Sequence, residues 1–430
     1  MRQKLLREGA DELSYEIRGI VRKAEQLQKL GHPIYWENIG DPIQKNRKLP
    51  DWIKSIIADL LTDDKTYAYS HSKGLLETRE FLAAKTNGLN DTQISVDDIT
   101  FFNGLGDAIA KIYQYLLPTA RVIGPSPTYS THSSAEAAHA NHHPITYKLD
   151  PENQWLPDLQ DLRNKVTYNP NIVGILVINP DNPTGMVYPR PILEQIVAIA
   201  TEFNLFLIFD ENIIYNNAET APMAKIIGQV PGISLKGISK EVPWPGARCG
   251  WAKYYNRNQD AEFNKLCQTI DNAKMIEVSS TTLPQHAIPR IMSDVRYVEF
   301  LKETSKSIGE RSKKLHAFFA EIPYVNFNLT NGAFYNTIIF KKGVLKPDQA
   351  LQISDSNTEA LLQSWLHPEM PLDQRFVYYL LAAKQVCVVP ISAFCSDLLG
   401  FRITLLEENV ADQMVIYDRL KAGILEYCEN

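Results

Sequence analysis

One lysine and one arginine lie close together in a stiff loop. The stretch GISKEVPWPGARCGW, residues 237–251, carries Lys240 and, eight positions later, Arg248 among prolines and glycines. The run GISLKGIS before Lys240 is typical of a buried strand, so the amine would emerge at a sheet edge. Desolvation there lowers the pKa of a lysine and makes it a nucleophile, which favours Schiff-base chemistry over an ordinary surface lysine.

Two further polar side chains follow predicted buried strands. Asp210 closes LFLIFD, where its half-buried charge requires a cation such as a protonated pyridine nitrogen. The alternative for Asp210 is the N-cap of the next helix. Asn182 lies in NPDNPTG, residues 179–185, where two Asn-Pro steps predict a rigid turn that aims the amide. The alternative for Asn182 is an ordinary tight loop.

A phosphate site is predicted at the start of a helix. NGLGDAIAKIY places Gly104, Leu105 and Gly106 where free backbone N–H groups and the helix dipole favour an anion. The planar guanidinium of Arg248 would complete that site. Tyr129, in GPSPTYS, could stack on an aromatic ring, although a tyrosine beside prolines more often serves packing.

The elements that must position these residues follow an α/β pattern. From about residue 100, short apolar runs (DITFFN, ARVIGP, NIVGILVIN, LFLIFD, GISLKGIS) alternate with helical patterns such as RPILEQIVAIATEFN. This alternation predicts a mostly parallel sheet covered by helices on both faces. Ligands of such sheets bind at the carboxyl ends of the strands, where Asn182, Asp210 and Lys240 are expected.

The flanking segments predict a second, smaller α/β domain. Residues 1–30 read as a helical arm, and a single long helix is expected through PRIMSDVRYVEFLKETSKSIGERSKKLHAFFAEI, residues 289–322. We predict three parts: residues 1–45 as the arm and part of the small domain, 46–290 as the large domain, and 291–430 as the C-terminal small domain.

Composition excludes several functional classes. A net charge of −6 without a basic block disfavours nucleic acid as a partner. The five cysteines form no CxxC pair, which disfavours a disulfide framework or a metal site and fits a reducing cytoplasm. No apolar run approaches the roughly 20 residues of a membrane span, and the charged N-terminus does not resemble a signal peptide. Small molecules are therefore the expected partners.

Taken together, these motifs resemble the fold type I pyridoxal-phosphate enzymes, specifically the class I/II aminotransferases of the aspartate aminotransferase superfamily. The resemblance runs from NIGDP to FRITLLEEN and rests on NPDNPTG, on DE after an apolar strand, and on SK followed by PGARCGW. It implies that the large sheet has seven strands. It also implies that Lys240 forms the internal aldimine with pyridoxal 5'-phosphate and moves the proton of the substrate α-carbon. Asp210 would pair with the ring nitrogen, and Asn182 would hold the 3'-oxygen and lie beside the substrate.

The resemblance also assigns the remaining site residues. It implies that the phosphate is bound by Gly104, Leu105, Gly106 and Arg248, with Ser239 as a further candidate, and that Tyr129 stacks on the ring. In a homodimer, Tyr69 would reach the partner subunit's phosphate. Arg402 and Gly40 would bind the α-carboxylate of the substrate. The alternative for Arg402 is an ion pair with the glutamates that follow it.

Three positions depart from the family pattern. Gly237 stands where a serine is common, and Ile213 stands where a tyrosine is common, with Tyr215 two residues later as a candidate replacement. Glu277 stands where the dicarboxylate-specific branch carries an arginine. We therefore hypothesise that aspartate is not the preferred amino donor.

The expected function is the transfer of an amino group from an amino acid to a 2-oxo acid. Two alternatives stay open at this point. A lyase or synthase of the same fold, such as a C–S β-lyase, would use the same site to break another bond, because fold does not select the reaction. A cofactor-binding regulator would need a DNA-binding module, for which the arm of about 30 residues is too short.

Overall fold

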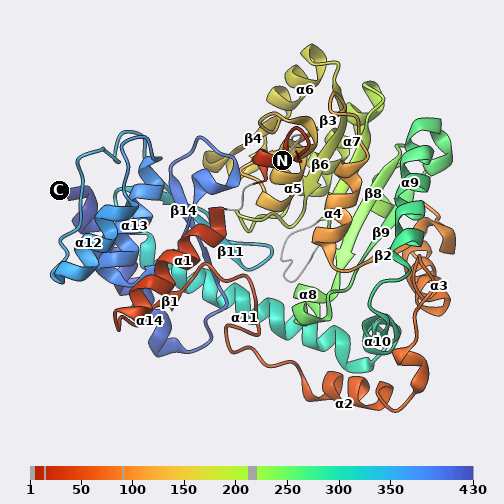
Figure 1. Cartoon of the computed structure of the whole chain (residues 1–430), viewed down its shortest axis with the longest axis horizontal. Coiled ribbons are helices and arrows are strands. Elements are labelled where there is room, and N and C mark those ends of the chain that lie inside the picture. The colour runs from red at the N-terminus through yellow and green to blue at the C-terminus, as the bar shows by residue number, and fades with distance from the viewer. Residues whose placement is uncertain (1–4, 14–15, 90–91, 212–219, 430) are drawn as a thin grey trace.

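The fold places a large and a small sheet side by side, and one long helix runs along both. The structure is a computed structural model, and it describes residues 5–13, 16–89, 92–211 and 220–429. Figure 1 shows the large sheet with its helices in yellow to green, and the C-terminal elements in blue beside the first helix in red. Helix α11 (Val295–Phe319) extends beneath the two parts.

The large sheet has eight strands in the order β2-β9-β8-β7-β6-β3-β4-β5, of which β8, β7, β6, β3 and β4 are parallel neighbours. Strands β9 and β5 run antiparallel to their neighbours. The strands are β2 (Ile99–Phe102), β3 (Arg121–Ser126), β4 (Thr146–Asp150), β5 (Leu156–Pro157), β6 (Ile172–Ile178), β7 (Phe206–Asp210), β8 (Gly232–Gly237) and β9 (Gly250–Tyr255).

The sheet is the mostly parallel one that the alternating pattern predicts, with one strand more than seven. The additional strand, β5, has two residues, Leu156–Pro157. It forms because the chain reverses after β4 with positive φ angles at Gln154 and Trp155, and the indole of Trp155 is buried against the core. Burial of that side chain brings the next two residues back alongside β4.

Helices cover both faces of this sheet. Alternate residues of β6 divide between two hydrophobic cores: Ile175 and Val177 face one, and Leu176 and Ile178 face the other. The first core contains side chains of α2 (Asp51–Leu60), α3 (Leu76–Asn87), α6 (Leu159–Tyr168), α7 (Arg190–Glu202) and α10 (Thr282–Met292). The second contains side chains of α4 (Leu105–Gln114) and α9 (Ala261–Glu277), and α5 (Ser130–Ala140) packs beside α4.

The small sheet belongs to a third core that joins the two ends of the chain. Its antiparallel strands are β10 (Val325–Phe327), β11 (Tyr335–Phe340), β14 (Gly400–Thr404) and β13 (Val389–Pro390), in that order. Strand β1 (Tyr35–Trp36) pairs with β12 (Val386–Cys387). This core includes side chains of α1 (Glu16–Lys29), α11, α12 (Ser356–Trp365), α13 (Leu372–Lys384) and α14 (Val410–Glu429). The domain boundaries at residues 45 and 290 stay a prediction.

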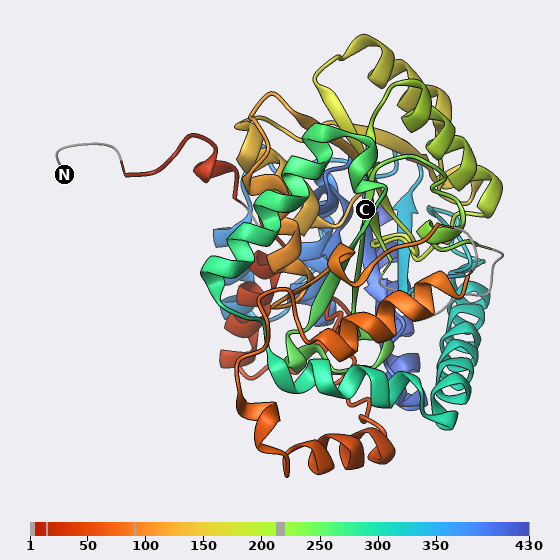
Figure 2. The same ribbon diagram turned by 90° about the vertical axis from the view of Figure 1, so that its right-hand side faces the viewer.

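Two expectations about helices need correction. The single long helix expected over residues 289–322 is two helices, α10 and α11, because Asp294 caps α11 by accepting a hydrogen bond from the N–H of Arg296. In the arm, the described helix α1 begins only at Glu16, and residues 5–13 contain one short turn that packs on α5. Figure 2 shows this segment, in red, running out from the body of the molecule.

Short helical turns complete the fold. The four-residue helix α8 (Ile238–Glu241) follows β8 directly, and the 3-10 turns are η1 (Ala10–Glu12), η2 (Asp64–Tyr67), η3 (Val96–Asp98), η4 (Pro151–Asn153), η5 (Met223–Lys225), η6 (Pro245–Ala247), η7 (Arg257–Gln259) and η8 (Ile391–Phe394). None of the helices in the described part of the chain combines the length and the apolar character that crossing a membrane requires.

Candidate active site

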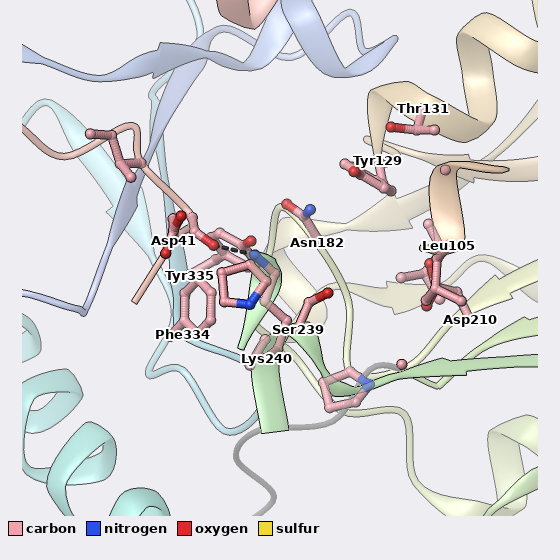
Figure 3. A pocket seen from close by; sticks show the side chains of 18 of the residues that line it. Asp41, Leu105, Tyr129, Thr131, Asn182, Asp210, Ser239, Lys240, Phe334 and Tyr335 are labelled. Carbon is pink, nitrogen blue, oxygen red and sulfur yellow. Dashed lines mark hydrogen bonds between the residues drawn. The ribbon is translucent and has the colours of Figure 1, made fainter. Parts of the chain in front are cut away.

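Most of the predicted site residues line one cavity of about 700 Å³ at the carboxyl ends of the parallel strands. In Figure 3, Phe334 and Tyr335 lie on one side of this cavity and Tyr129, Leu105 and Asp210 on the other, with Asn182, Ser239 and Lys240 between them. The predicted residues that line it are Gly40, Leu105, Gly106, Tyr129, Asn182, Asp210, Ser239, Lys240, Arg248 and Arg402.

Lys240 lies on α8, immediately after the carboxyl end of β8. Its Nζ donates a hydrogen bond to the carbonyl oxygen of Gly40 and lies 5.6 Å from the ring centroid of Phe334. Burial lowers the pKa of the lysine to about 8, an effect that Asp41 opposes and the nearby Arg402 and Arg248 reinforce. The neutral fraction of the amine near physiological pH is therefore larger than that of an exposed lysine, and the neutral form is the nucleophile.

Asp210 ends β7, and its buried carboxylate faces the cavity. Its Oδ2 lies 3.4 Å from Nε2 of His132, whereas its Oδ1 is buried and has no hydrogen-bond partner among the described residues. A buried carboxylate oxygen without a partner is costly unless a cationic group fills the place beside it. A protonated ring nitrogen satisfies this requirement.

The turn after β6 brings Asn182 to the cavity. Within the turn, Oδ2 of Asp181 accepts hydrogen bonds from the N–H and the hydroxyl of Thr184, and burial raises the pKa of this carboxyl to about 7. Gly185 has φ 71°, and a Cβ there would lie 2.0 Å from the carbonyl oxygen of Tyr335. The turn is thus fixed against the small sheet, and Asn182 Oδ1 accepts a hydrogen bond of 3.2 Å from Arg402 Nη1.

The N-terminus of α4 and Arg248 form a cradle of the kind that phosphate binds. Gly104 is the N-cap of α4 with φ 89°, and a Cβ there would lie 2.4 Å from Arg248 Nη2. Only glycine permits the guanidinium to approach this turn so closely. The first N–H groups of α4, on Leu105 and Gly106, have no helical partner of their own and border the cavity. The donor set therefore fits a phosphate.

Arg402 lies on β14, opposite Thr337 of β11. Its Nη2 donates to the carbonyl oxygen of Asn38 at 2.7 Å, and its guanidinium carbon lies 4.6 Å from the ring centroid of Tyr335. The glutamates that follow Arg402 have other cationic partners: Glu407 pairs with Lys45 at 3.1 Å, and Glu408 lies 3.9 Å from Arg311. The buried guanidinium instead faces the cavity.

Several residues singled out from the sequence, Gly104 among them, do not line the cavity or lie outside the described chain. Tyr69 does not line the cavity of its own chain, and its side chain is 85% exposed. Tyr215 and Ile213 lie outside the described residues. Glu277 does not reach the cavity either; its carboxylate pairs with Lys274 and with Lys111, each at 2.8 Å.

The sequence reasoning missed several residues at or near the cavity. His132 does not line the cavity but lies 3.4 Å from Asp210; it follows Tyr129 by three positions, a spacing that could have suggested a shared face, and it lies edge-on to the Tyr129 ring at 6.3 Å between centroids. Asp41 lines the cavity directly after Gly40 in NIGDP, and Tyr335 lines it 95 positions after Lys240. Arg18 of α1 also lines the cavity, although the arm was read only as a helix.

Comparisons with known proteins agree with this geometry. The family model of aminotransferase class I and II matches residues 38–415. An uncharacterized aminotransferase of Methanocaldococcus jannaschii is 50% identical over the full length of both chains. The glutamate-pyruvate aminotransferase of Escherichia coli is 28% identical over 76% of this chain and 80% of its own.

Among solved structures, the alanine aminotransferase of Pyrococcus furiosus matches 98% of this chain and 100% of its own, with a TM-score of 0.84 and 25% identity. These relatives are aminotransferases, and they do not favour the lyase or the regulator as alternatives. The chain belongs to the class I and II aminotransferases, and it is an enzyme that transfers amino groups.

Proposed function

We propose that the enzyme holds pyridoxal 5'-phosphate in the cavity between Lys240, Asp210 and the N-terminus of α4. The observation that carries this proposal is the buried Oδ1 of Asp210, which has no hydrogen-bond partner in the described part of the chain and lies in the same cavity as a lysine of lowered pKa and the start of α4 beside Arg248. Each feature matches one part of the molecule: ring nitrogen, aldehyde and phosphate.

The cofactor supplies an aldehyde that condenses with amines and a protonated ring that draws electrons from the substrate α-carbon. Lys240 would hold the aldehyde, and its neutral Nζ would take up the proton of the substrate α-carbon and return it. The negative charge of Asp210 would favour a protonated ring nitrogen. Tyr129 would pack against the ring, and Ser239 would support the phosphate beside Gly237, where a serine hydroxyl is missing.

Arg402 and Asn182 bind and orient the substrate. The guanidinium of Arg402 suits a two-pronged pair with the α-carboxylate, and it donates to the carbonyl oxygen of Asn38, two residues before Gly40. With the carboxylate held, the C–H bond of the α-carbon would be presented to Lys240, which would favour deprotonation over loss of the carboxylate. Asn182 would join the two roles, since its amide contacts Arg402 and lines the cavity proposed for the ring.

The substrates we propose are small amino acids and 2-oxo acids, with alanine and glutamate as donors. The relative from Escherichia coli is named a glutamate-pyruvate aminotransferase and the one from Mycobacterium tuberculosis an alanine aminotransferase. These names support alanine and glutamate as donors. Aspartate is not the preferred donor in this proposal. Glu277 supports this, because it stands where the dicarboxylate-specific branch carries an arginine and so provides no positive charge for the second carboxylate of aspartate. Its own carboxylate pairs with two lysines outside the cavity.

We further propose a homodimer in the cytoplasm. The exposed side chain of Tyr69, which does not line its own cavity, supports a role at the partner subunit's phosphate. Five free cysteines support a reducing compartment.

An absorbance experiment tests the proposed function. Purified protein loaded with pyridoxal phosphate is scanned before and after addition of single amino acids, and the products are then assayed with pyruvate or 2-oxoglutarate as acceptor. We expect alanine and glutamate to change the spectrum and to yield their 2-oxo acids in amounts equal to the new amino acid formed. Formation of ammonia and pyruvate without a new amino acid would overturn the assignment, and the highest kcat/KM with aspartate would overturn the donor proposal.

A further inference from the structure

We propose that Glu277 is a positioning residue for the cofactor phosphate, which it serves through Asn103 without touching the cavity. The proposal rests on the proposed function, because it concerns the phosphate cradle at the start of α4. Glu277 is the last residue of α9, and Asn103 directly precedes the N-cap Gly104. The two side chains meet at 2.6 Å, where Nδ2 of Asn103 donates to Oε1 of Glu277.

Each polar group of Asn103, in the side chain and in the backbone, makes a hydrogen bond. Besides the contact with Glu277, its Oδ1 accepts from the N–H of Thr281 at 3.1 Å, and its own N–H donates to Oδ2 of Asp107 at 3.0 Å. Its carbonyl oxygen accepts from Arg248 Nη2 at 3.4 Å. The conformation of this one residue therefore sets both the direction of the first N–H groups of α4 and one contact of the arginine beside them.

Two lysines hold the carboxylate of Glu277 in place. Lys274, with no exposed surface, lies 2.8 Å from Oε1 of Glu277 and 3.6 Å from Asp107, and Lys111 lies 2.8 Å from Oε2. Burial alone would raise the pKa of Glu277, but its ion pairs with the two lysines keep it below its usual value. The two lysines also offset the negative charges of Glu277 and Asp107, which lie near the proposed phosphate site and would otherwise repel the anion.

The residues after Glu277 connect it to the second half of the cradle. Val278 has φ 77°, which a β-branched side chain rarely adopts. Such a strained conformation persists only where its surroundings hold it on both sides. Glu277 is anchored on one side, and on the other the hydroxyl of Thr281 contacts the carbonyl oxygens of Ala247 and Arg248 at 3.3 and 3.2 Å. Residues 277–281 thus join the turn before α4 to the arginine loop.

The test compares two ligands that differ only in the phosphate. Cofactor-free protein is titrated with pyridoxal phosphate and with pyridoxal, and the dissociation constants are measured by absorbance for wild type, Glu277→Ala and Glu277→Gln. We expect Glu277→Ala to weaken binding of pyridoxal phosphate about tenfold or more, since a hydrogen bond to a charged group is lost. Pyridoxal should bind within about twofold of wild type. Glu277→Gln retains an acceptor for Asn103 and should recover part of the affinity.

Glu262→Ala, an exposed glutamate at the other end of α9, is the matched control and should bind both ligands as wild type does. Asn103→Ala removes the same hydrogen bond from the other side chain, so it should also weaken binding of pyridoxal phosphate and leave binding of pyridoxal nearly unchanged. The double variant should add little to the effect of either single change. Equal losses for the two ligands, or an unchanged constant for pyridoxal phosphate, would overturn the positioning role. A wild type that binds neither ligand would instead overturn the proposed function, and this inference with it.

Discussion

The two walls of the cavity differ in how the chain builds them. On the sheet side, Asn182, Asp210 and Lys240 each stand within a few residues of the end of a neighbouring parallel strand. On the opposite side, residues 38–41, Tyr335 and Arg402 come from three distant stretches that meet in the small-sheet core. One wall follows from a single repeated rule of chain geometry, and the other depends on long-range packing.

The difference suggests a division of labour. The sheet wall supplies the groups that we propose hold the cofactor, which stays bound, and backbone hydrogen bonds within one sheet keep these groups in register. The other wall supplies Arg402, which we propose binds a substrate that enters and leaves. The two walls meet at few polar contacts, namely Arg402 with Asn182 and Lys240 with the Gly40 carbonyl. Variants on each side should therefore fail in different ways.

The largest effect is expected on the sheet wall. Lys240→Ala removes the amine that binds the aldehyde and moves the α-proton, so kcat/KM should fall at least about a thousandfold, measured with the best amino donor. Borohydride reduction followed by peptide mapping should label Lys240 in the loaded wild type. Lys225→Ala, at an exposed lysine, should retain both activity and label. A wild-type protein in which the label falls on another lysine would contradict the assignment.

On the opposite wall, Arg402→Lys keeps the charge but loses the planar pair of donors. KM for amino acids should rise about 10-fold to 100-fold, because one charge-assisted hydrogen bond is lost. Cofactor affinity, measured by titration, should stay within a few-fold of wild type. Arg163→Lys, in the exposed pair with Glu202, should change neither quantity. If Arg402→Lys weakened the cofactor as strongly as the substrate, the division between the walls would be wrong.

The free energy of unfolding of cofactor-free protein should depend on the charge of the buried Lys240 amine. The pKa of Lys240 is lowered from 10.5 to about 8, so the folded state disfavours its charged form. Below pH 8 the ammonium is charged in the folded and the unfolded state, so the full free-energy cost of burying the charge is present. Above pH 10.5 the amine is neutral in both states, and this cost disappears. Lys240→Met should therefore raise the free energy of unfolding at pH 7 by roughly 1–3 kcal/mol, with allowance for partial solvent contact.

This gain should shrink steadily between pH 8 and 10.5, the interval over which the folded state alone loses the proton. Urea unfolding at several pH values measures it. A gain that is the same at pH 7 and pH 10.5 would mean that the lysine is not the source, and Lys225→Met provides the baseline for an exposed lysine.

The smallest expected effect crosses the proposed dimer boundary. Tyr69→Phe removes one hydroxyl, so cofactor affinity at matched protein concentration should weaken about 2-fold to 10-fold, the usual range for one hydrogen bond. Tyr67→Phe is a close control, because Tyr67 is also exposed and its hydroxyl donates to Leu61 of its own chain at 2.9 Å. Equal affinities for Tyr69→Phe and wild type would remove the tyrosine from the proposed site.

The strands of the large sheet could be predicted because their signals are local. Continuous apolar runs such as NIVGILVIN become strands, here β6, and Asn182, Asp210 and Lys240, at or shortly after the ends of three strands, line the cavity. Where a competing local signal was overlooked, the prediction was wrong: Asp294 caps a new helix inside what reads as one helical pattern. The short strand β5 had no signal of its own, because the burial of Trp155 produces it.

The sequence by itself determined the sheet, its strand ends and the residue types that can bind an aldehyde, a ring nitrogen and a phosphate, since these depend on neighbours within a few positions. Only the tertiary structure decided that Arg402 reaches Asn182 across 220 positions, that His132 lies beside Asp210, and that Glu277 turns away from the cavity to Asn103. The physical reason is that such contacts depend on how separate cores pack together, and no periodicity along the chain records that packing.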